Sequence, residues 1–273
     1  MALVPFPSPQ SGALQKPRPD DEEEEVVGGR MSFLEHLEEL RKRIIYACYG
    51  IAIAVGGSFF FIQQIYDFLT APAIATLPAG SKLIYTQPTE AFSLYINISL
   101  IAGIVFSAPF IMFQVWKFIA PGLYSNEKRL AIPFVLFSTL GFLAGAAFNH
   151  YVAYPFIMVY FASFNTPNLS YMPQLSEVFG LYMKMLLGLG VIFQMPTVVF
   201  FLAKIGVVSG RFLLAQFKYA VLIIFIVAAV VTPTGDPMTL MVFAAPMIGL
   251  YILSIVIAWA VGPKRNRNSA ASA

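Results

Sequence analysis

Groups that could form disulfides or bind metal ions are scarce in this sequence. It contains one cysteine, Cys48, and two histidines, His36 and His150. A single cysteine excludes a disulfide within the chain and a site built from several thiolates. The two histidines fall on opposite sides of the membrane in the topology derived below, so they cannot share a metal ion. We therefore expect no metal site and no cofactor.

Charged residues are also few. Only 11% of the residues are Asp, Glu, Lys or Arg, whereas 58% are hydrophobic. A soluble domain carries about 25% charged residues, so the composition indicates a polytopic membrane protein. The HExxH and GxSxG motifs and a phosphate-binding glycine loop are absent. The polar residues within the apolar runs are mostly single amides and hydroxyls, which argues against an intramembrane enzyme.

Six apolar runs divide the chain, and a membrane-spanning helix takes about 20 such residues. They are Ile44–Ile65, Phe92–Trp116, Leu130–His150, Val178–Leu202, Gln216–Val231 and Met238–Val261. The fifth run is short, because Phe217–Val231 spans about 22 Å as a helix against about 30 Å of hydrocarbon. Local thinning of the bilayer, or a tilt of the longer neighbouring helices, is expected around it. The predicted fold is all-α, with six transmembrane helices.

Lys and Arg gather at alternate connections between these runs. They precede the first run, follow the second, lie between the fourth and fifth, and close the chain, whereas the other side has only Lys82 and Lys184. The positive-inside rule therefore places both termini in the cytoplasm. The loops around Asp67–Ala91, Tyr151–Glu177 and Thr232–Pro237 are then expected outside.

Composition divides the chain into three segments. Residues 1–30 are rich in Pro, Gly and acidic residues and predict a disordered tail. Residues 31–262 hold the six-span membrane domain, and residues 263–273 form a basic cytoplasmic tail.

The segment FLEHLEELRKR, residues 33–43, predicts a charged amphipathic helix that leads into the first run. Ser32 and Glu35 have the spacing of a capping box, which starts the helix. Glu39 and Arg43 form a pair four residues apart in the favourable order. An alternative interpretation is an interfacial helix that merely anchors the first span.

Three segments together resemble a known family. They are LEELRKR before the first run, FQVWKFIAPGLYSNEKR after the second, and TPTGD before the sixth. In this order and topology they resemble the TatC component of the twin-arginine protein translocase, over Met31 to Arg267. The resemblance implies six kinked helices that form a concave, cupped bundle, with both termini cytoplasmic.

The resemblance also implies a function, in the bacterial cytoplasmic (inner) membrane. The chain would be a membrane receptor and core subunit that binds Arg-Arg signal peptides of folded precursor proteins at its cytoplasmic face. With TatA- and TatB-type single-span subunits it would export them, using the proton-motive force. The subunit is expected to self-associate in a receptor complex, and it is not expected to bind nucleic acid.

The same resemblance assigns a binding site for the two arginines of the signal peptide. Two guanidinium groups fit two carboxylates, each in bidentate fashion, and these are assigned to Glu39 and Glu127. The assigned apolar contacts are Leu40, Phe118 and Leu123, while Pro121 and Gly122 shape the loop, and Arg41 and Arg43 support topology and the orientation of Glu39. Alternatively, Glu39 pairs with Arg43, and Glu127 is a solvated loop charge.

A second assigned site concerns partner helices. Gln194 lies mid-span beside Pro196, where the family often has a glutamate that receives a polar residue from the single-span subunits. A glutamine cannot carry charge, so proton-linked chemistry is in doubt here, while hydrogen bonding to a partner helix stays open. Alternatively, Gln194 bonds to another helix of the bundle. Asp236, in the TPTGD segment, is a structural or partner-contact residue by the same resemblance.

Prolines and glycines predict features of packing. Pro109, Pro196 and Pro246 lie within apolar runs, where each removes a backbone donor and favours a kink. Gly141 and Gly145 have the four-residue spacing of a surface for close helix packing.

A transporter of small solutes is the alternative function. It would need ionisable residues near the middle of the membrane, and the runs carry almost none. Lys184, two turns after Glu177, lies close to the outer interface, and its reach toward the headgroups explains it without a function.

Overall fold

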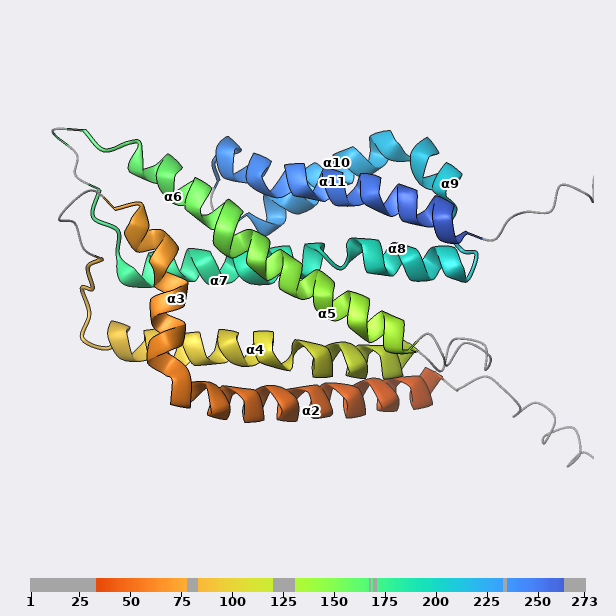
Figure 1. The fold of residues 1–273 in the computed structure, drawn as a ribbon, viewed down its shortest axis with the longest axis horizontal. Coiled ribbons are helices and arrows are strands. Elements are labelled where there is room, and N and C mark those ends of the chain that lie inside the picture. Colours follow the sequence, from red (N-terminus) through yellow and green to blue (C-terminus); the bar gives the residue numbers. More distant parts are fainter. Residues whose placement is uncertain are drawn as a thin grey trace, which may run out of the picture. The chain divides into compact units, whose positions relative to one another are not determined.

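The computed structural model describes residues 33–77, 83–119, 131–166, 168, 171–232 and 235–262, and over these ranges the chain is helical, with no β-strand (Figure 1). The elements are α2 (Phe33–Ser58), η1 (Phe59–Phe61), α3 (Ile62–Ala75), α4 (Glu90–Ile119), α5 (Ala131–Phe148), η4 (Asn149–Ala153), α6 (Tyr154–Ala162), α7 (Leu175–Ile192), α8 (Met195–Lys204), α9 (Gly210–Ala215), α10 (Phe217–Val231) and α11 (Pro237–Val261). Described residues up to Arg41 belong to one compact unit, and those from Lys42 onward to a second.

Six helical segments correspond to the six predicted spans. Among the described residues, five are long and apolar enough to cross a membrane. They are Leu34–Ala75, Glu90–Ile119, Ile132–Ala162, Leu175–Lys204 and Pro237–Val261. The sixth is the shorter apolar helix α10, with the bounds Phe217–Val231 that the sequence predicts. The prediction of an all-α, multi-pass membrane fold is confirmed.

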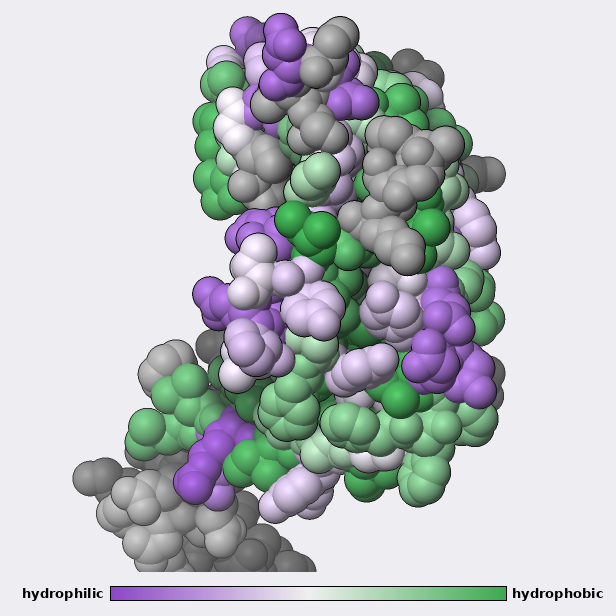
Figure 2. Space-filling model, turned by 90° about the vertical axis from the view of Figure 1, so that its left-hand side faces the viewer, coloured by the Kyte–Doolittle hydropathy of each residue, from purple (hydrophilic) through white to green (hydrophobic). Residues whose placement is uncertain are grey.

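The second unit has two ends, which we name after residues of α4. At the Glu90 end α4, α7 and α11 begin, and at the Lys117 end α4, α8 and α11 finish (Figure 1). An isolated parallel bridge between Ile84 and Gln174 joins the segments that lead into α4 and α7. Figure 2 looks onto the Glu90 end, where hydrophilic residues are interspersed with hydrophobic ones.

Two segments predicted as loops are partly helical. Asp67 to Ala75 belongs to α3, and Tyr151 to Ala162 belongs to η4 and α6. The third helical segment passes through η4, a turn of π-helix, and Pro155 lies in the first turn of α6, where a missing N–H costs little. Residues 151–162, YVAYPFIMVYFA, are themselves apolar, so the longer helix was indicated by the sequence and the prediction of a loop from Tyr151 was wrong there.

Breaks in the helices follow proline only in part. The helix is interrupted at Phe193 and Gln194, next to Pro196, as predicted. At Pro109 and Pro246, α4 and α11 continue as α-helices, and the kinks predicted at these two prolines stay a prediction. An unpredicted break at η1 follows the sequence Gly-Gly-Ser, which is a known cause of kinks, and beyond it α3 runs in a different direction (Figure 1).

The core of the second unit is built around α7. Tyr182, Met185 and Leu189 are almost completely buried there. They belong to one apolar cluster with residues of the neighbouring helices, including Ile98 and Ile101 of α4, Ile157 and Met158 of α6, and Phe243 and Met247 of α11. Helix α7 therefore contributes three of the most deeply buried side chains of this shared core.

The predicted glycine surface of α5 packs against this central segment. A Cβ on Gly145 would lie 2.7 Å from the carbonyl oxygen of Leu189, and one on Gly141 would lie 3.0 Å from that of Phe193. Contacts this short leave no room for a side chain. The prediction of a close-packing surface at Gly141 and Gly145 is confirmed.

Candidate functional site

The first part of the predicted peptide site lies at the start of α2. Glu39, Leu40 and Arg43 are half-buried, and Arg41 is exposed. Glu39 and Arg43 each interact with another group, so Glu39 is not an isolated carboxylate. These contacts fit both interpretations of Glu39, as a ligand and as the partner of a basic residue.

The second part lies at the Lys117 end of α4. Phe118 is half-buried in the last turn of this helix, and the ammonium of Lys117 lies 4.6 Å from the centre of the Phe113 ring. The other residues assigned to this part, Pro121, Gly122, Leu123 and Glu127, lie outside the described residues. Whether Glu39 and Glu127 come together therefore stays a prediction.

An aromatic cluster fixes the two helices that flank residues 120–130. Trp116 of α4, Phe134 of α5 and Phe201 of α8 are buried together, with ring centres 4.7 to 5.4 Å apart. Aromatic pairs at such distances stabilise a fold by about 0.5–1.5 kcal/mol each. The end of α4 and the start of α5 are thus held in place on either side of the predicted binding loop.

Gln194 connects two helices at the break between α7 and α8. Its amide nitrogen, Nε2, donates to the carbonyl oxygen of Ser138 in α5 at 3.0 Å and to that of Gly190 in α7 at 3.4 Å. The alternative in which Gln194 bonds within the bundle is therefore realised. A contact with a partner helix stays a prediction.

A cavity of about 570 Å³ lies beside this break. Its walls come from α5, from the residues around Pro196, and from α11, and they include Leu140, Phe200, Leu253 and Ile257. The lining is almost entirely apolar, with Thr197 as its hydroxyl-bearing residue. The sequence placed Gln194 and Pro196 together but could not show which helices face them.

Asp236 caps the start of α11. One carboxylate oxygen accepts a hydrogen bond from the backbone N–H of Thr239 at 2.8 Å, and the other accepts from the Thr239 hydroxyl at 2.8 Å. Pro237 occupies the first turn, where no N–H is required. Of the two roles that the resemblance gave Asp236, the structure shows the structural one. The Asp-Pro-Met-Thr sequence was the readable signal for this cap.

The Glu90 end holds a polar cluster that sequence reasoning missed. The carboxylate of Glu90, a residue only 8% exposed, accepts four hydrogen bonds. Oε2 accepts from the backbone N–H groups of Thr86 at 3.0 Å and Gln87 at 3.4 Å and from Nε2 of Gln174 at 3.3 Å, and Oε1 accepts from the N–H of Ser176 at 2.9 Å. We call this arrangement the Glu90 clamp.

Backbone pairing completes the clamp. The N–H of Leu175 donates to the carbonyl of Ile84 at 2.8 Å, and the N–H of Ile84 donates to the carbonyl of Pro173 at 3.3 Å. An acidic residue in the first turn of a helix is readable from sequence, because it complements the helix dipole. Its partners before and within α7 are more than 80 residues away and were not readable.

His150 was also assigned no contacts from sequence. Its Nδ1 lies 3.1 Å from the hydroxyl of Tyr182, and the ring of Phe68 stacks on it with centres 4.1 Å apart. These contacts join α3, η4 and α7. Within the part of the chain that the structure describes, no group of three metal-binding side chains is found.

Comparisons with known proteins agree with one another. The profile of the family described as Sec-independent protein translocase protein (TatC) matches residues 35–246. The TatC protein of Koribacter versatilis is 45% identical over 87% of this chain and 88% of its own length, and that of Helicobacter pylori strain 26695 is 42% identical over 86% and 90%. The TatC protein of Aquifex aeolicus is 34% identical over 83% and 94%.

Solved structures show the same similarity in three dimensions. Two crystal structures of a twin-arginine translocase receptor, TatC, align with TM-scores of 0.71 and 0.72 at 33% and 32% identity. They cover 82% of this chain and 98% or 99% of theirs. Family, relatives and fold all point to a multi-pass component of a protein translocase, not to an enzyme. The chain belongs to the TatC family, the Sec-independent protein translocase subunit.

Proposed function

We propose that this subunit is the receptor for twin-arginine signal peptides, and that the peptide binds at the Lys117 end. The observation that carries the proposal is the Trp116, Phe134 and Phe201 cluster, which holds the end of α4 and the start of α5 around residues 120–130. In the sequence, Glu127 lies between these two fixed helix ends. The solved relatives are themselves described as twin-arginine translocase receptors.

Recognition rests on the geometry of arginine. Each guanidinium presents a planar fork of donors that a carboxylate accepts with two parallel hydrogen bonds, and lysine cannot reproduce this arrangement. Glu39 and Glu127 receive one arginine each. Leu40, Phe118 and Leu123 pack against the apolar part of the signal, while Pro121 and Gly122 shape the loop. Arg41 and Arg43 do not bind the arginines; they orient Glu39.

The Lys117 end is the cytoplasmic face in this proposal. The Lys and Arg residues of the sequence gather at the connections on that side, which retain positive charge during insertion. Both termini then lie in the cytoplasm, and the Glu90 end lies across the bacterial inner membrane. Transport of the folded precursor uses the proton-motive force, and several copies of the subunit assemble in the receptor complex.

The cavity beside Gln194 is the proposed contact for TatA- and TatB-type single-span subunits. Its apolar walls, from α5, the α7–α8 break and α11, suit the side chains of a transmembrane helix. Pro196, at the break, lines this cavity, and the Asp236 cap sets where α11, one of the walls, begins. The amide of Gln194 lies at the break beside this cavity. When a partner helix binds, this amide would exchange its hydrogen bond to Ser138 for one to the partner.

A photocrosslinking experiment tests the receptor role. A photoreactive residue in place of Phe118 should crosslink to a precursor with an Arg-Arg signal and much less to the same precursor with Lys-Lys. A photoreactive residue in place of the exposed Phe156, on α6, is the matched control and should capture neither. Equal crosslinking of both precursors at position 118 would contradict recognition of arginine there.

A further inference from the structure

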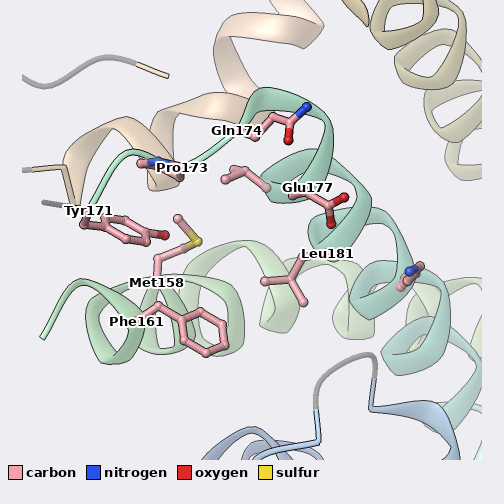
Figure 3. Close-up of a pocket in the computed structure, with 9 residues that line it drawn as sticks. Met158, Phe161, Tyr171, Pro173, Gln174, Glu177 and Leu181 are labelled. Carbon is pink, nitrogen blue, oxygen red and sulfur yellow. The ribbon is translucent and has the colours of Figure 1, made fainter. Parts of the chain in front are cut away.

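A second candidate site lies near the Glu90 end, between α6 and α7, and Figure 3 shows it. Met158 and Phe161 of α6 face Glu177 and Leu181 of α7, and Tyr171 and Pro173 close one side. The pocket has a volume of about 280 Å³ and also includes Lys184. Apolar walls with one carboxylate and one ammonium make it unlike the apolar cavity beside Gln194.

The charged groups of this pocket lie on one stripe of α7. Gln174, Glu177, Leu181 and Lys184 follow at intervals of three, four and three residues, so they share a helix face. Glu177 and Lys184 are both exposed. Neither side chain forms an ion pair or hydrogen bond with any residue that the structure describes. Both charges are therefore available to a ligand.

Their depths in the bilayer differ. Helices α7 and α8 together span about 45 Å, against about 30 Å of hydrocarbon. If the excess is shared between the two ends, the Cα of Lys184 lies about 6 Å inside the hydrocarbon edge, and that of Glu177 lies outside it. The side chain of Lys184 is long enough to bring its ammonium to the headgroup level. The pocket thus presents a cation at the deeper position and an anion at the shallower one.

This order of charges matches a zwitterionic phospholipid. In such a lipid the anionic phosphate lies next to the glycerol and the ammonium lies farther out, toward water. We propose that the pocket binds a phospholipid with a primary ammonium headgroup, from the leaflet on the Glu90 side. Lys184 pairs with the phosphate and Glu177 with the ammonium, and the acyl chain lies along Met158, Phe161 and Leu181.

Choice among lipids follows from the same contacts. A primary ammonium donates hydrogen bonds to the carboxylate of Glu177, whereas a trimethylated one has no proton to donate. An anionic lipid without an ammonium satisfies Lys184 but places its remaining headgroup next to a negative charge. The expected order of binding is phosphatidylethanolamine, then phosphatidylcholine, then phosphatidylglycerol.

Native mass spectrometry of the purified full chain tests this site, with each of the three lipids added in turn. The Lys184→Met variant, which keeps most of the apolar stem, should retain about fivefold less phosphatidylethanolamine, the upper range for one exposed ion pair. Lys204→Met, at the far end of α8, is the matched control and should bind as wild type. Glu177→Gln should remove the preference over phosphatidylglycerol, and Lys184→Arg should restore retention.

Two results would overturn the proposal. One is equal retention of phosphatidylethanolamine by wild type and the Lys184→Met variant. The other is loss of a copurifying single-span protein in that variant with lipid retention unchanged, which would assign the ammonium to a carboxylate of a protein partner. Either result leaves recognition of arginine at the Lys117 end untouched.

Discussion

The two ends of the bundle are held together by different forces. At the Glu90 end, one carboxylate receives four hydrogen bonds from the chain itself, and a short backbone pairing joins the same segments. At the Lys117 end, three buried aromatic rings hold the helices. The carboxylate of Glu90 accepts its hydrogen bonds from the same chain. In our proposal, the carboxylates of Glu39 and Glu127 instead accept hydrogen bonds from the signal peptide. A carboxylate can therefore serve stability at one end and recognition at the other.

The largest expected effect is at the Lys117 end. Glu127→Ala should abolish crosslinking of an Arg-Arg signal peptide, because a guanidinium loses its bidentate acceptor. The variant should still insert into the membrane and unfold at the wild-type temperature. Binding measured by crosslinking, together with a thermal melt, checks both statements. Unchanged crosslinking would remove Glu127 from the site.

The opposite pattern is expected for Glu90. Glu90→Ala leaves the N–H groups of Thr86 and Ser176 without their acceptor, and hydrogen bonds to a charged group are among the stronger ones in a fold. We expect the melting temperature to fall by about 5 °C, while the affinity for the signal peptide is unchanged. The control is Glu177→Gln, which changes an exposed acidic residue of α7 that donates or accepts no bond in the clamp. This variant should melt as wild type. A Glu90→Ala variant that melts normally would show that the clamp adds no stability.

Gln194 lies between these two cases, because its amide serves the bundle and, by our proposal, a partner. Gln194→Leu loses the bond to Ser138, which contributes about 1 kcal/mol. Copurification of single-span subunits should fall several-fold. Ser138→Ala is the control, because it keeps the carbonyl that accepts the bond and should leave both properties unchanged. Copurification at the wild-type level in the leucine variant would leave Gln194 with a purely structural role.

The smallest effect is expected at Asp236. Asp236→Ala removes an N-cap, which costs about 1 kcal/mol, and Asp236→Asn should recover most of the loss, since an amide oxygen also caps. Chemical denaturation of the purified chain measures both. If the asparagine variant is as weak as the alanine one, the charge of Asp236 matters beyond the cap.

Periodicity and composition predicted the elements that depend on local sequence. The six spans, the short α10, the break beside Pro196 and the close packing at Gly141 and Gly145 all follow from residues near one another in the chain. Kinks were predicted at Pro109 and Pro246, and both helices continue as α-helix through these prolines, so the kinks there stay a prediction. A proline removes one hydrogen bond, and packing by neighbouring helices can compensate for that loss.

Contacts between distant segments could not be predicted in this way. Two of the four donors to Glu90, from Gln174 and Ser176, and the stacking of Phe68 on His150 join residues more than 80 positions apart. The π-helical turn at η4 has no local signature that the sequence pattern expresses. The Asp236 cap is a local feature. The sequence Asp-Pro-Met-Thr is typical of a helix N-terminus, but the sequence analysis did not assign a capping role to Asp236. For the peptide site, sequence supplied the residues, and their mutual placement stays a prediction.

A charge-swap experiment tests the central claim most directly. The Glu39→Lys, Glu127→Lys double variant is combined with a precursor whose Arg-Arg pair is replaced by Glu-Glu, and crosslinking is compared with each single change. The account predicts that the double variant with the Arg-Arg precursor, and the wild-type receptor with the Glu-Glu precursor, both fail to crosslink. The double variant with the Glu-Glu precursor should recover a substantial part of the crosslinking. Failure of the swapped pair to crosslink, with the double variant folded and inserted, would contradict direct pairing of these carboxylates with the signal arginines.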